Sequence, residues 1–135
     1  MADQGPFAVK PDEIEDFETP HHEGTRSVEL VNPERGSDDA VFRISTLEPG
    51  GGDNWHHHDS SDQLIFVRSG TGLLQVKEST DSEEVIDYEL EPETFVFLPA
   101  GTPHHGENDG DELLELIVVW APPYDSFDEW KADDE

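Results

Sequence analysis

The chain has no cysteine and only seven lysine and arginine residues, against 34 aspartate and glutamate residues. Without cysteine, disulfide bonds and thiolate metal sites are both excluded. The formal net charge of -27 at pH 7 repels nucleic acid and anionic membrane surfaces, so we expect neither as a partner. No apolar stretch approaches membrane-spanning length, and Met1–Lys10 lacks the apolar core of a signal peptide. These absences predict a soluble, cytoplasmic protein.

The acidic residues are spread along the whole chain instead of forming a tail. Disordered acidic chains lack apolar runs, and this chain has several, so we expect one folded domain with a real core. A surface of this charge suits high salt, where screening relieves the repulsion between carboxylates. The composition therefore suggests a halophilic microbe as the source, an archaeon in the first instance.

Three segments can be separated along the chain. Residues 1–25 form an acidic, proline-punctuated arm, which we expect to pack on the body through Phe7, Ile14 and Phe17. Residues 26–124 carry the short apolar runs, and residues 125–135 form an acidic tail in which Phe127 and Trp130 are spaced for a short docked helix. The expected strands cover residues 28–31, 41–47, 63–67, 73–77, 85–90, 94–98 and 113–120. Short strands separated by turns predict an all-β barrel or jelly roll.

Three consecutive histidines, His56, His57 and His58, follow the glycines at positions 50–52. Side chains of an extended strand alternate between its two faces, so His56 and His58 point the same way and His57 points the opposite way. Two imidazoles at this spacing can share one metal ion, since histidine is the commonest metal ligand. A second pair of histidines, at positions 104 and 105, follows a Pro/Gly turn.

The two histidine stretches together resemble the motifs of the cupin family. The first motif, a glycine followed by HxH, an acidic residue and a second glycine, corresponds to Gly50, His56, His58, Gln63 and Gly70. Gln63 stands where that family usually has glutamate. The second motif corresponds to Pro99, Gly101, His104 and Asn108, with Glu93 in place of its leading glycine. The resemblance implies the cupin double-stranded β-helix, a jelly-roll barrel, here with a loosely structured N-terminal arm.

The resemblance also implies a metal site inside the barrel. His56, His58 and His104 would converge on one divalent transition ion (Fe, Mn, Zn, Ni or Cu), with Gln63 as the fourth ligand. Asp62 could replace Gln63 only if the strand register slipped by one residue. A glutamine oxygen adds no negative charge, so the ion would keep its full charge among neutral ligands.

The remaining histidines have simpler interpretations. His57 and His105 fall on the opposite faces of their strands, which favours solvated or supporting roles. His21 and His22 lie in the N-terminal arm and are expected to be solvated loop residues. The aromatic residues near the motifs are interpreted as core or pocket wall, namely Trp55, Phe95, Phe97 and Trp120. Arg68 is expected to form a surface ion pair or an interface contact.

Two classes of function are open at this stage. The first is a small metalloenzyme, a dioxygenase, isomerase or lyase, acting on a small metabolite. The second is a non-catalytic cupin that binds a metal or metabolite as a sensor or carrier. Glu115 and Tyr88 are candidate acid/base groups whose place in the fold is open, and no catalytic residue is assigned. Leu64 and Phe66 lie on the face opposite Gln63, and this surplus apolar surface predicts a homodimer, with covering by the N-terminal arm as the alternative.

Overall fold

The computed structural model describes residues 5–123 and 131–132. Apart from one short 3-10 helix, η1 (Pro11–Glu13), the elements of the described residues are strands. They are β1 (Phe17–Glu18), β2 (His22–Val31), β3 (Val41–Asp53), β4 (His56–His57), β5 (Asp62–Ser69), β6 (Gly72–Val76), β7 (Ile86–Leu90), β8 (Phe95–Leu98), β9 (His104–Glu107), β10 (Leu114–Ala121) and β11 (Lys131–Ala132). The predicted all-β class is confirmed. No helix in this part of the chain is long and apolar enough to cross a membrane.

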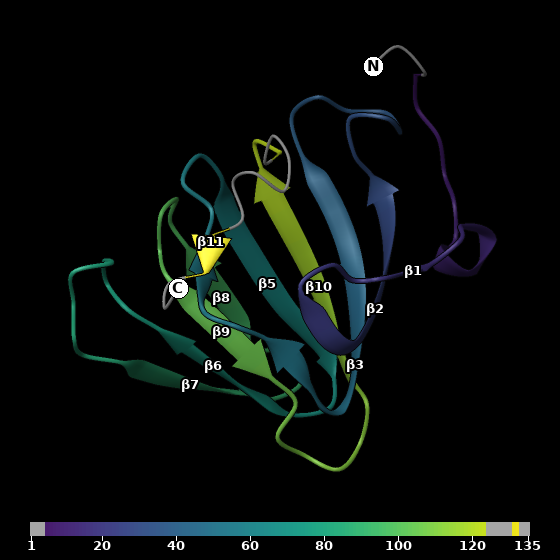
Figure 1. The fold of residues 1–135 in the computed structure, drawn as a ribbon. Helices are drawn as coiled ribbons and strands as arrows, with labels where there is room; N and C mark the ends of the chain where they lie inside the picture. Colours follow the sequence, from purple (N-terminus) through teal and green to yellow (C-terminus); the bar gives the residue numbers. More distant parts are fainter. Residues whose placement is uncertain (1–4, 124–130, 133–135) are drawn as a thin grey trace.

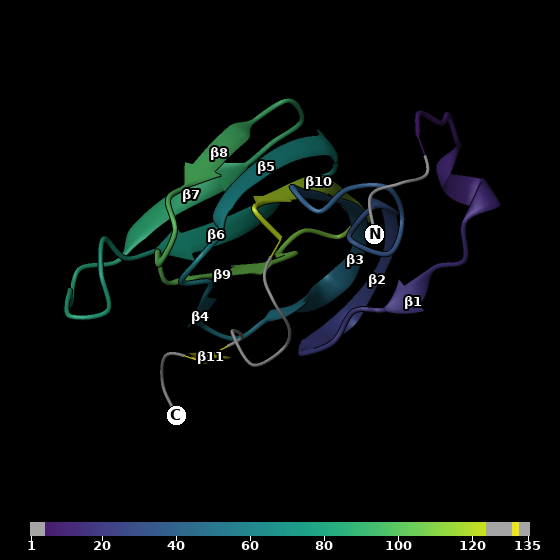
Figure 2. The ribbon, with the colours of Figure 1, turned by 90° about the horizontal axis from the view of Figure 1, so that it is seen from above.

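The strands form one strongly curled sheet, which gives the predicted jelly-roll architecture (Figures 1 and 2). Its main path runs β11-β4-β9-β3-β10-β5-β8, with β2 added to β3 and the β6–β7 hairpin added to β9. All strand pairs are antiparallel. Seen from above, the sheet bends so that β6 and β9 lie across from β5 and β8 (Figure 2).

The hydrophobic core fills the space between these two walls. Alternate residues of the strands point inward, as the period of two requires. The buried cluster draws on β3, β5, β6, β7, β8 and β10 and consists of Val41, Leu47, Ile65, Val67, Leu74, Val76, Leu90, Val96, Leu98, Leu114, Val118 and Trp120. One end of the barrel is therefore sealed by aliphatic side chains, while the histidines gather toward the other end.

Two predicted strand limits were wrong, both near the site. The strand expected over residues 41–47 continues through Pro49 and the glycines, so that β3 ends at Asp53. β2 begins at His22, within the segment assigned to the N-terminal arm. The division of the chain at residues 25 and 125 stays a prediction, and the proposed helix around Phe127 and Trp130 lies outside the described residues.

The continuation of β3 depends on a glycine. Gly52 pairs with Glu107 across β3 and β9, and a Cβ at Gly52 would collide with the carbonyl oxygen of Gly106 and approach Glu107 Cα to 2.9 Å. Only a residue without a side chain allows the two backbones to come this close. This contact brings β9, and His104 with it, next to the end of β3.

We expect Gly52→Ala to lower the free energy of unfolding by about 2–4 kcal/mol, because two backbones must separate. Gly50→Ala is the matched control: its φ is 86° and its Cβ would meet nothing within 4 Å. It should cost only about 1–2 kcal/mol of left-handed strain. Denaturant unfolding of the two variants measures the difference, and equal losses would contradict the close approach of β3 and β9.

Candidate metal centre

Three buried histidines meet at the open end of the barrel. His56 is 2%, His58 3% and His104 4% exposed. One ligand atom from each lies within 4.8 Å of those of the other two. His56 and His104 face each other across β4 and β9, with ring centroids 4.3 Å apart, and the His58 ring centroid is 5.1 Å from that of His56. The structure thus brings together the three histidines that the sequence selected.

Local backbone contacts set the orientation of two of these rings. His56 and His104 are each the first residue of a strand, and each donates its Nδ1–H to the carbonyl two residues earlier, Asn54 O at 2.8 Å and Thr102 O at 2.9 Å. A carbonyl oxygen can only accept, so the proton sits on Nδ1 and the lone pair on Nε2. Such carbonyl contacts commonly fix the tautomer of metal-binding histidines.

Burial keeps the three imidazoles uncharged. Desolvation is the main cause that lowers the pKa of His56 and His104, and it lowers the pKa of His58 to about 3. Repulsion by His104 adds to the lowered pKa of His56 and His58, whereas the negative charge of Asp53 raises that of His104. Metal ions bind neutral imidazole, so at neutral pH all three rings are in the form that binds.

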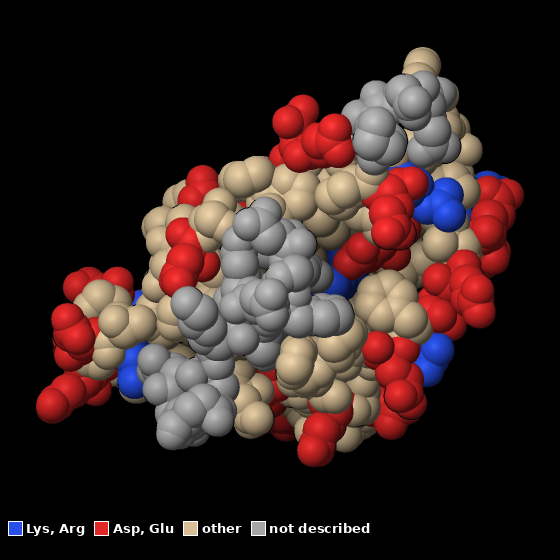
Figure 3. Space-filling model, turned by 45° about the horizontal axis from the view of Figure 1, so that its top comes forward, with Lys and Arg blue, Asp and Glu red and all other residues tan. Residues whose placement is uncertain are grey.

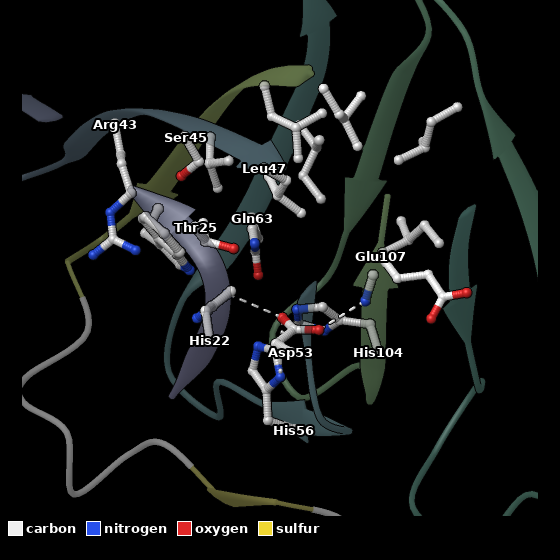
Figure 4. Close-up of a pocket in the computed structure, with 18 residues that line it drawn as sticks. His22, Thr25, Arg43, Ser45, Leu47, Asp53, His56, Gln63, His104 and Glu107 are labelled. Carbon is white, nitrogen blue, oxygen red and sulfur yellow. Dashed lines mark hydrogen bonds and ion pairs between the residues drawn. The ribbon is translucent and has the colours of Figure 1, made fainter. Parts of the chain in front are cut away.

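Gln63 completes the group. It is 7% exposed, and neither its Oε1 nor His104 Nε2, both buried, has a hydrogen-bond partner among the described residues. In Figure 4 the Gln63 amide points toward His56, Asp53 and His104. A divalent ion is a natural partner for such buried acceptor atoms. These residues therefore fit a metal ion. Asp62 does not face the group, because its Oδ1 accepts the Ala100 amide at 3.0 Å.

The neighbouring histidines, His57 and His105, lie outside the cluster, as the strand alternation predicts. His57 Nδ1 contacts Asp59 Oδ1 at 2.6 Å, on the outside of β4. The His105 ring contacts Asp53 O through Nδ1 at 3.1 Å and Gln75 Oε1 through Nε2 at 2.9 Å. His105 therefore supports the strand end next to the site.

His22 was expected to be a solvated loop residue, and this prediction was wrong. It is the first residue of β2, its side chain is 15% exposed, and its Nε2 lies 3.2 Å from Asp53 Oδ2. His22 and Asp53 are direct partners across β2 and β3. The ring centroid of His22 is 6.4 Å from that of His56. No local signal marked His22, because its place depends on a strand pairing between residues far apart in the sequence.

A cavity of about 60 Å³ adjoins the histidines. His22, Asp53, His56, Gln63 and His104 line one end of it (Figure 4). The rest of the wall is mainly aliphatic, and its polar residues are Thr25, Arg43, Ser45 and Glu107. The cavity therefore offers a ligand aliphatic contacts along most of its wall and the imidazoles with Gln63 at one end.

One polar residue of this wall, Arg43, is buried with its charge compensated. Its Nη2 lies 2.6 Å from Glu29 Oε2, and its guanidinium carbon lies 4.6 Å from the centre of the Trp120 ring. Trp120 in turn makes an edge contact with the ring of His58, with centroids 5.8 Å apart. Trp120 is 3% exposed, so its prediction as core or pocket wall is confirmed.

Other expected roles changed. Phe95 and Phe97 are 56% and 51% exposed on the outer face of the sheet, so their assignment to the core or the pocket was wrong. Tyr88 is 40% exposed and does not line the cavity. Glu115 pairs with Arg68 at 3.4 Å, which confirms the surface ion pair expected for Arg68 and removes Glu115 as an acid/base candidate.

Comparison with known proteins agrees with this architecture. The model of the cupin domain matches residues 43–120, more than half of the chain. The chain belongs to the cupin family. The uncharacterized protein MJ1618 of Methanocaldococcus jannaschii is 29% identical over 73 residues, which are 54% of this chain and 53% of that protein. The acireductone dioxygenase of a Sulfurihydrogenibium species is 31% identical over 67 residues, 50% of this chain and 36% of that enzyme. The chain thus spans about half or less of these relatives.

Solved structures show the same cupin fold. The polyketide cyclase RemF from Streptomyces resistomycificus has a TM-score of 0.70 and 20% identity, covering 90% of this chain and 82% of that one. A predicted oxalate decarboxylase from Thermotoga maritima has a TM-score of 0.69 and 20% identity, covering 87% of this chain and 100% of that one. At 20% identity these similarities establish the fold of the cupin. Its reaction has to be inferred from the residues of the site.

The buried histidines predict how the metal-free cupin responds to acid. Their folded pKa values lie below the value of about 6.5 expected in the unfolded chain, so the unfolded state binds more protons as the pH falls. The contribution of the neutral histidines to the free energy of unfolding is therefore fully present above about pH 6.5. It declines as the pH falls below that value, and for His58 the decline continues down toward pH 3. The melting temperature of metal-free protein should fall between pH 7 and pH 5, a range chosen above the titration of most carboxylates.

Two variants separate this effect from general acid sensitivity. His58→Gln should show a weaker fall than wild type, because one buried imidazole is gone. His21→Asn removes an exposed histidine and should keep the wild-type slope. A wild-type melting temperature that stays level across this range, or a slope unchanged in His58→Gln, would contradict the burial of neutral imidazoles.

Proposed function

We propose that this cupin is a metal-dependent enzyme acting on a small, oxygen-rich metabolite, with dioxygenase chemistry as the first reaction to test. One observation carries the proposal: three buried, neutral histidines have ligand atoms within 4.8 Å of one another beside a small cavity. His56, His58 and His104 would hold one divalent ion, with Gln63 as the fourth ligand. The inward aim of Gln63 and the outward contact of Asp62 support this set.

The chemistry would depend on the ion. When bound, a divalent transition ion polarises the oxygen atoms of a substrate, and a redox-active one also exchanges electrons with dioxygen. The chain's own residues shape the surroundings. The hydroxyl groups of Thr25 and Ser45 line the cavity while bonded to Glu23 O and Ser27 Oγ, and the aliphatic wall excludes water from the reacting atoms.

The cavity limits the size of the substrate. One buried water molecule needs about 10–15 Å³ of cavity volume. If each non-hydrogen atom of a substrate takes about the same space, the cavity of 60 Å³ holds roughly four to six of them. A larger molecule would extend past Asp53 and Glu107 into the neighbouring pocket that these two residues also line. We therefore favour small enols and diols whose oxygen atoms can approach the ion while their carbon chain contacts the aliphatic wall.

The relatives guide the choice of reaction. One is an acireductone dioxygenase, and the fold neighbours include a polyketide cyclase and a predicted oxalate decarboxylase. Decarboxylation and isomerisation need a positioned acid or base. In the described wall, the carboxylates that line the cavity are Asp53 and Glu107, and both also line a neighbouring pocket. This placement favours chemistry centred on the ion. It is also compatible with the second candidate function, a non-catalytic cupin that binds metal or metabolite.

A metal-binding and turnover experiment tests the proposal. Wild-type protein, purified without chelator, should bind one divalent transition ion per chain and consume dioxygen with at least one member of a panel of enols and diols. His104→Ala should abolish stoichiometric binding and turnover, because it removes one of three buried ligands. His57→Ala is the matched control, since its ring contacts Asp59 outside the cluster, and should retain both.

The outcomes separate the two candidate functions. Metal binding with ligand-induced stabilisation but no turnover would support the sensor or carrier. A wild-type protein without a stoichiometric ion would contradict both, and equal loss from His57→Ala and His104→Ala would contradict the assignment of ligands.

We also infer that this cupin forms a homodimer through the outer face of its sheet. Phe66 pairs with Phe95, and Leu64 with Phe97, so the four side chains share that face. Phe66, Phe95 and Phe97 are 37%, 56% and 51% exposed. The neighbouring strand β10 extends the apolar surface through the partners of Phe66 and Leu64, Ile117 and Val119.

The described part of the arm does not supply an evident cover for this face. Phe17 lies near Arg43, whose guanidinium carbon is 5.6 Å from its ring centre, and Phe7 contacts Gly36. Burying an exposed apolar patch stabilises an interface by about 25 cal/mol per Å². A second copy, related by twofold symmetry, is the commonest partner for such a patch.

We expect Phe66→Glu and Phe97→Glu to convert the protein to a monomer in sedimentation at high salt, since each places a charge in the interface. Both should still bind one metal ion, because neither residue lines the cavity. Val85→Glu, at another exposed apolar residue (42%), should remain dimeric. A wild-type protein that already sediments as a monomer would exclude the dimer.

We infer further that this cupin works in the cytoplasm of a halophile. Figure 3 shows Asp and Glu side chains distributed around the visible face with few Lys or Arg among them. At a net charge of -27, repulsion between carboxylates opposes the folded state when the Debye length exceeds about 10 Å.

The melting temperature should therefore rise steeply from low-salt buffer to molar KCl. An uncharged osmolyte at the same concentration is the control. It does not screen charge, so it should not reproduce the increase in melting temperature that the first additions of KCl produce. A melting temperature independent of KCl would exclude the halophilic interpretation.

A further inference from the structure

The carboxylate of Asp53 lies at the centre of the contacts around the histidine cluster. Its Oδ1 accepts the Gly106 amide at 2.8 Å, and its Oδ2 lies 3.2 Å from His22 Nε2 and 3.6 Å from His56 Nδ1. Its backbone oxygen accepts His105 Nδ1 at 3.1 Å. One residue therefore contacts β2, β4 and β9. Figure 4 shows the ion pair between Asp53 and His22 as a dashed line.

These contacts bear on the ligands themselves. Gly106 lies two residues after His104 on β9, so the bond from its amide to Asp53 fixes the strand that presents His104. His56 follows Asp53 by three residues and begins the short strand β4, which pairs with β9 through His56 and His104. Asp53 thus contacts both of the strands that present His56 and His104.

The charge of Asp53 is as important as its contacts. Its side chain is 10% exposed, so water screens it only weakly. The candidate ligands His56, His58, His104 and Gln63 are all neutral and would leave a divalent ion uncompensated. Glu107 also lines the cavity, but in Figure 4 its carboxylate is turned away from the histidines. Asp53 is therefore the carboxylate placed to act on an ion in the cluster.

We propose that Asp53 is the positioning and charge-compensating residue of the metal centre, supplying beside the ligands the negative charge that Gln63 does not provide. The inference rests on the proposed metal site and adds a residue that does not itself bind the ion. Carboxylates that contact ligating histidines commonly change metal affinity by 10- to 100-fold. His22 has a defined part here: it holds the Asp53 carboxylate from the β2 side.

Substitutions that separate charge from shape test the proposal. Asp53→Asn keeps an oxygen for the Gly106 amide and removes the charge. We expect its affinity for Zn²⁺, measured by competition with a chelator, to fall about tenfold or more. Gln63→Glu introduced into Asp53→Asn returns one negative charge to the site and should restore the affinity to within about threefold of wild type. Molar KCl in the buffer suppresses adventitious Zn²⁺ on surface carboxylates.

Asp59→Asn is the matched control. This substitution also removes a carboxylate that contacts a histidine close to the ligands in sequence. The histidine that Asp59 contacts is His57, which lies outside the cluster. Its affinity should stay within about twofold of wild type. An unchanged affinity in Asp53→Asn, or a loss that Gln63→Glu fails to restore, would overturn the proposal. Absence of Zn²⁺ binding in wild type would instead overturn the metal centre itself, and the role of Asp53 with it.

A measurement on wild-type protein covers the case in which Asp53→Asn does not fold. In protein carrying ¹³C-labelled aspartate, saturation with Zn²⁺ should shift the side-chain carboxyl resonance of Asp53 and leave that of Asp59 nearly unchanged. Carboxyl resonances report nearby charge, and a merely structural residue would not respond in this selective way. Equal or absent shifts of the two resonances would contradict the role of Asp53.

Discussion

The site depends on keeping three imidazoles uncharged and fixed inside a protein that is otherwise crowded with carboxylates. Burial supplies the first requirement, because desolvation lowers the pKa of His56, His58 and His104. The second is met for His56 and His104 by backbone carbonyls that take up Nδ1–H. Each ring then has its proton committed and its Nε2 lone pair available. Metal ligation requires this state, and the barrel maintains it without relying on any acidic ligand.

The fold contributes through the close approach of β3 and β9. Because Gly52 has no side chain, β3 runs on past residue 47 and brings Asp53 to the histidines. β9 lies against it and presents His104, while β4 presents His56 opposite. Aliphatic residues fill the other end of the barrel, so the polar cluster occupies one end and the stabilising core the other.

Sequence alone identified what depends on short-range pattern. Alternation along a strand separated His56 and His58 from His57, and the order of the two histidine motifs indicated both the jelly roll and His104. Sequence did not reveal what depends on long-range pairing. His22 reaches the site only because β2 pairs with β3 in a register that sets it opposite Asp53.

The sequence also did not reveal which aromatic side chains are exposed. Phe95 and Phe97 were interpreted as core or pocket wall because they are large and apolar, yet strand parity turns them outward. Likewise, Pro49 and the glycines indicate a bend by composition, whereas pairing with β2 and β9 keeps them in an extended strand. In each case tertiary contacts decided between conformations that the local sequence left open.

Crystals grown with Co²⁺ at molar KCl, with diffraction recorded on both sides of the cobalt absorption edge, test whether His56, His58, His104 and Gln63 hold one metal ion. We expect one strong anomalous peak per chain, bounded by Nε2 of His56 and His104, a ring nitrogen of His58 and Oε1 of Gln63, with Asp53 adjacent but not coordinated. Anomalous density confined to surface carboxylates, or a peak whose ligands include His57 or Asp62 instead, would contradict this set of ligands.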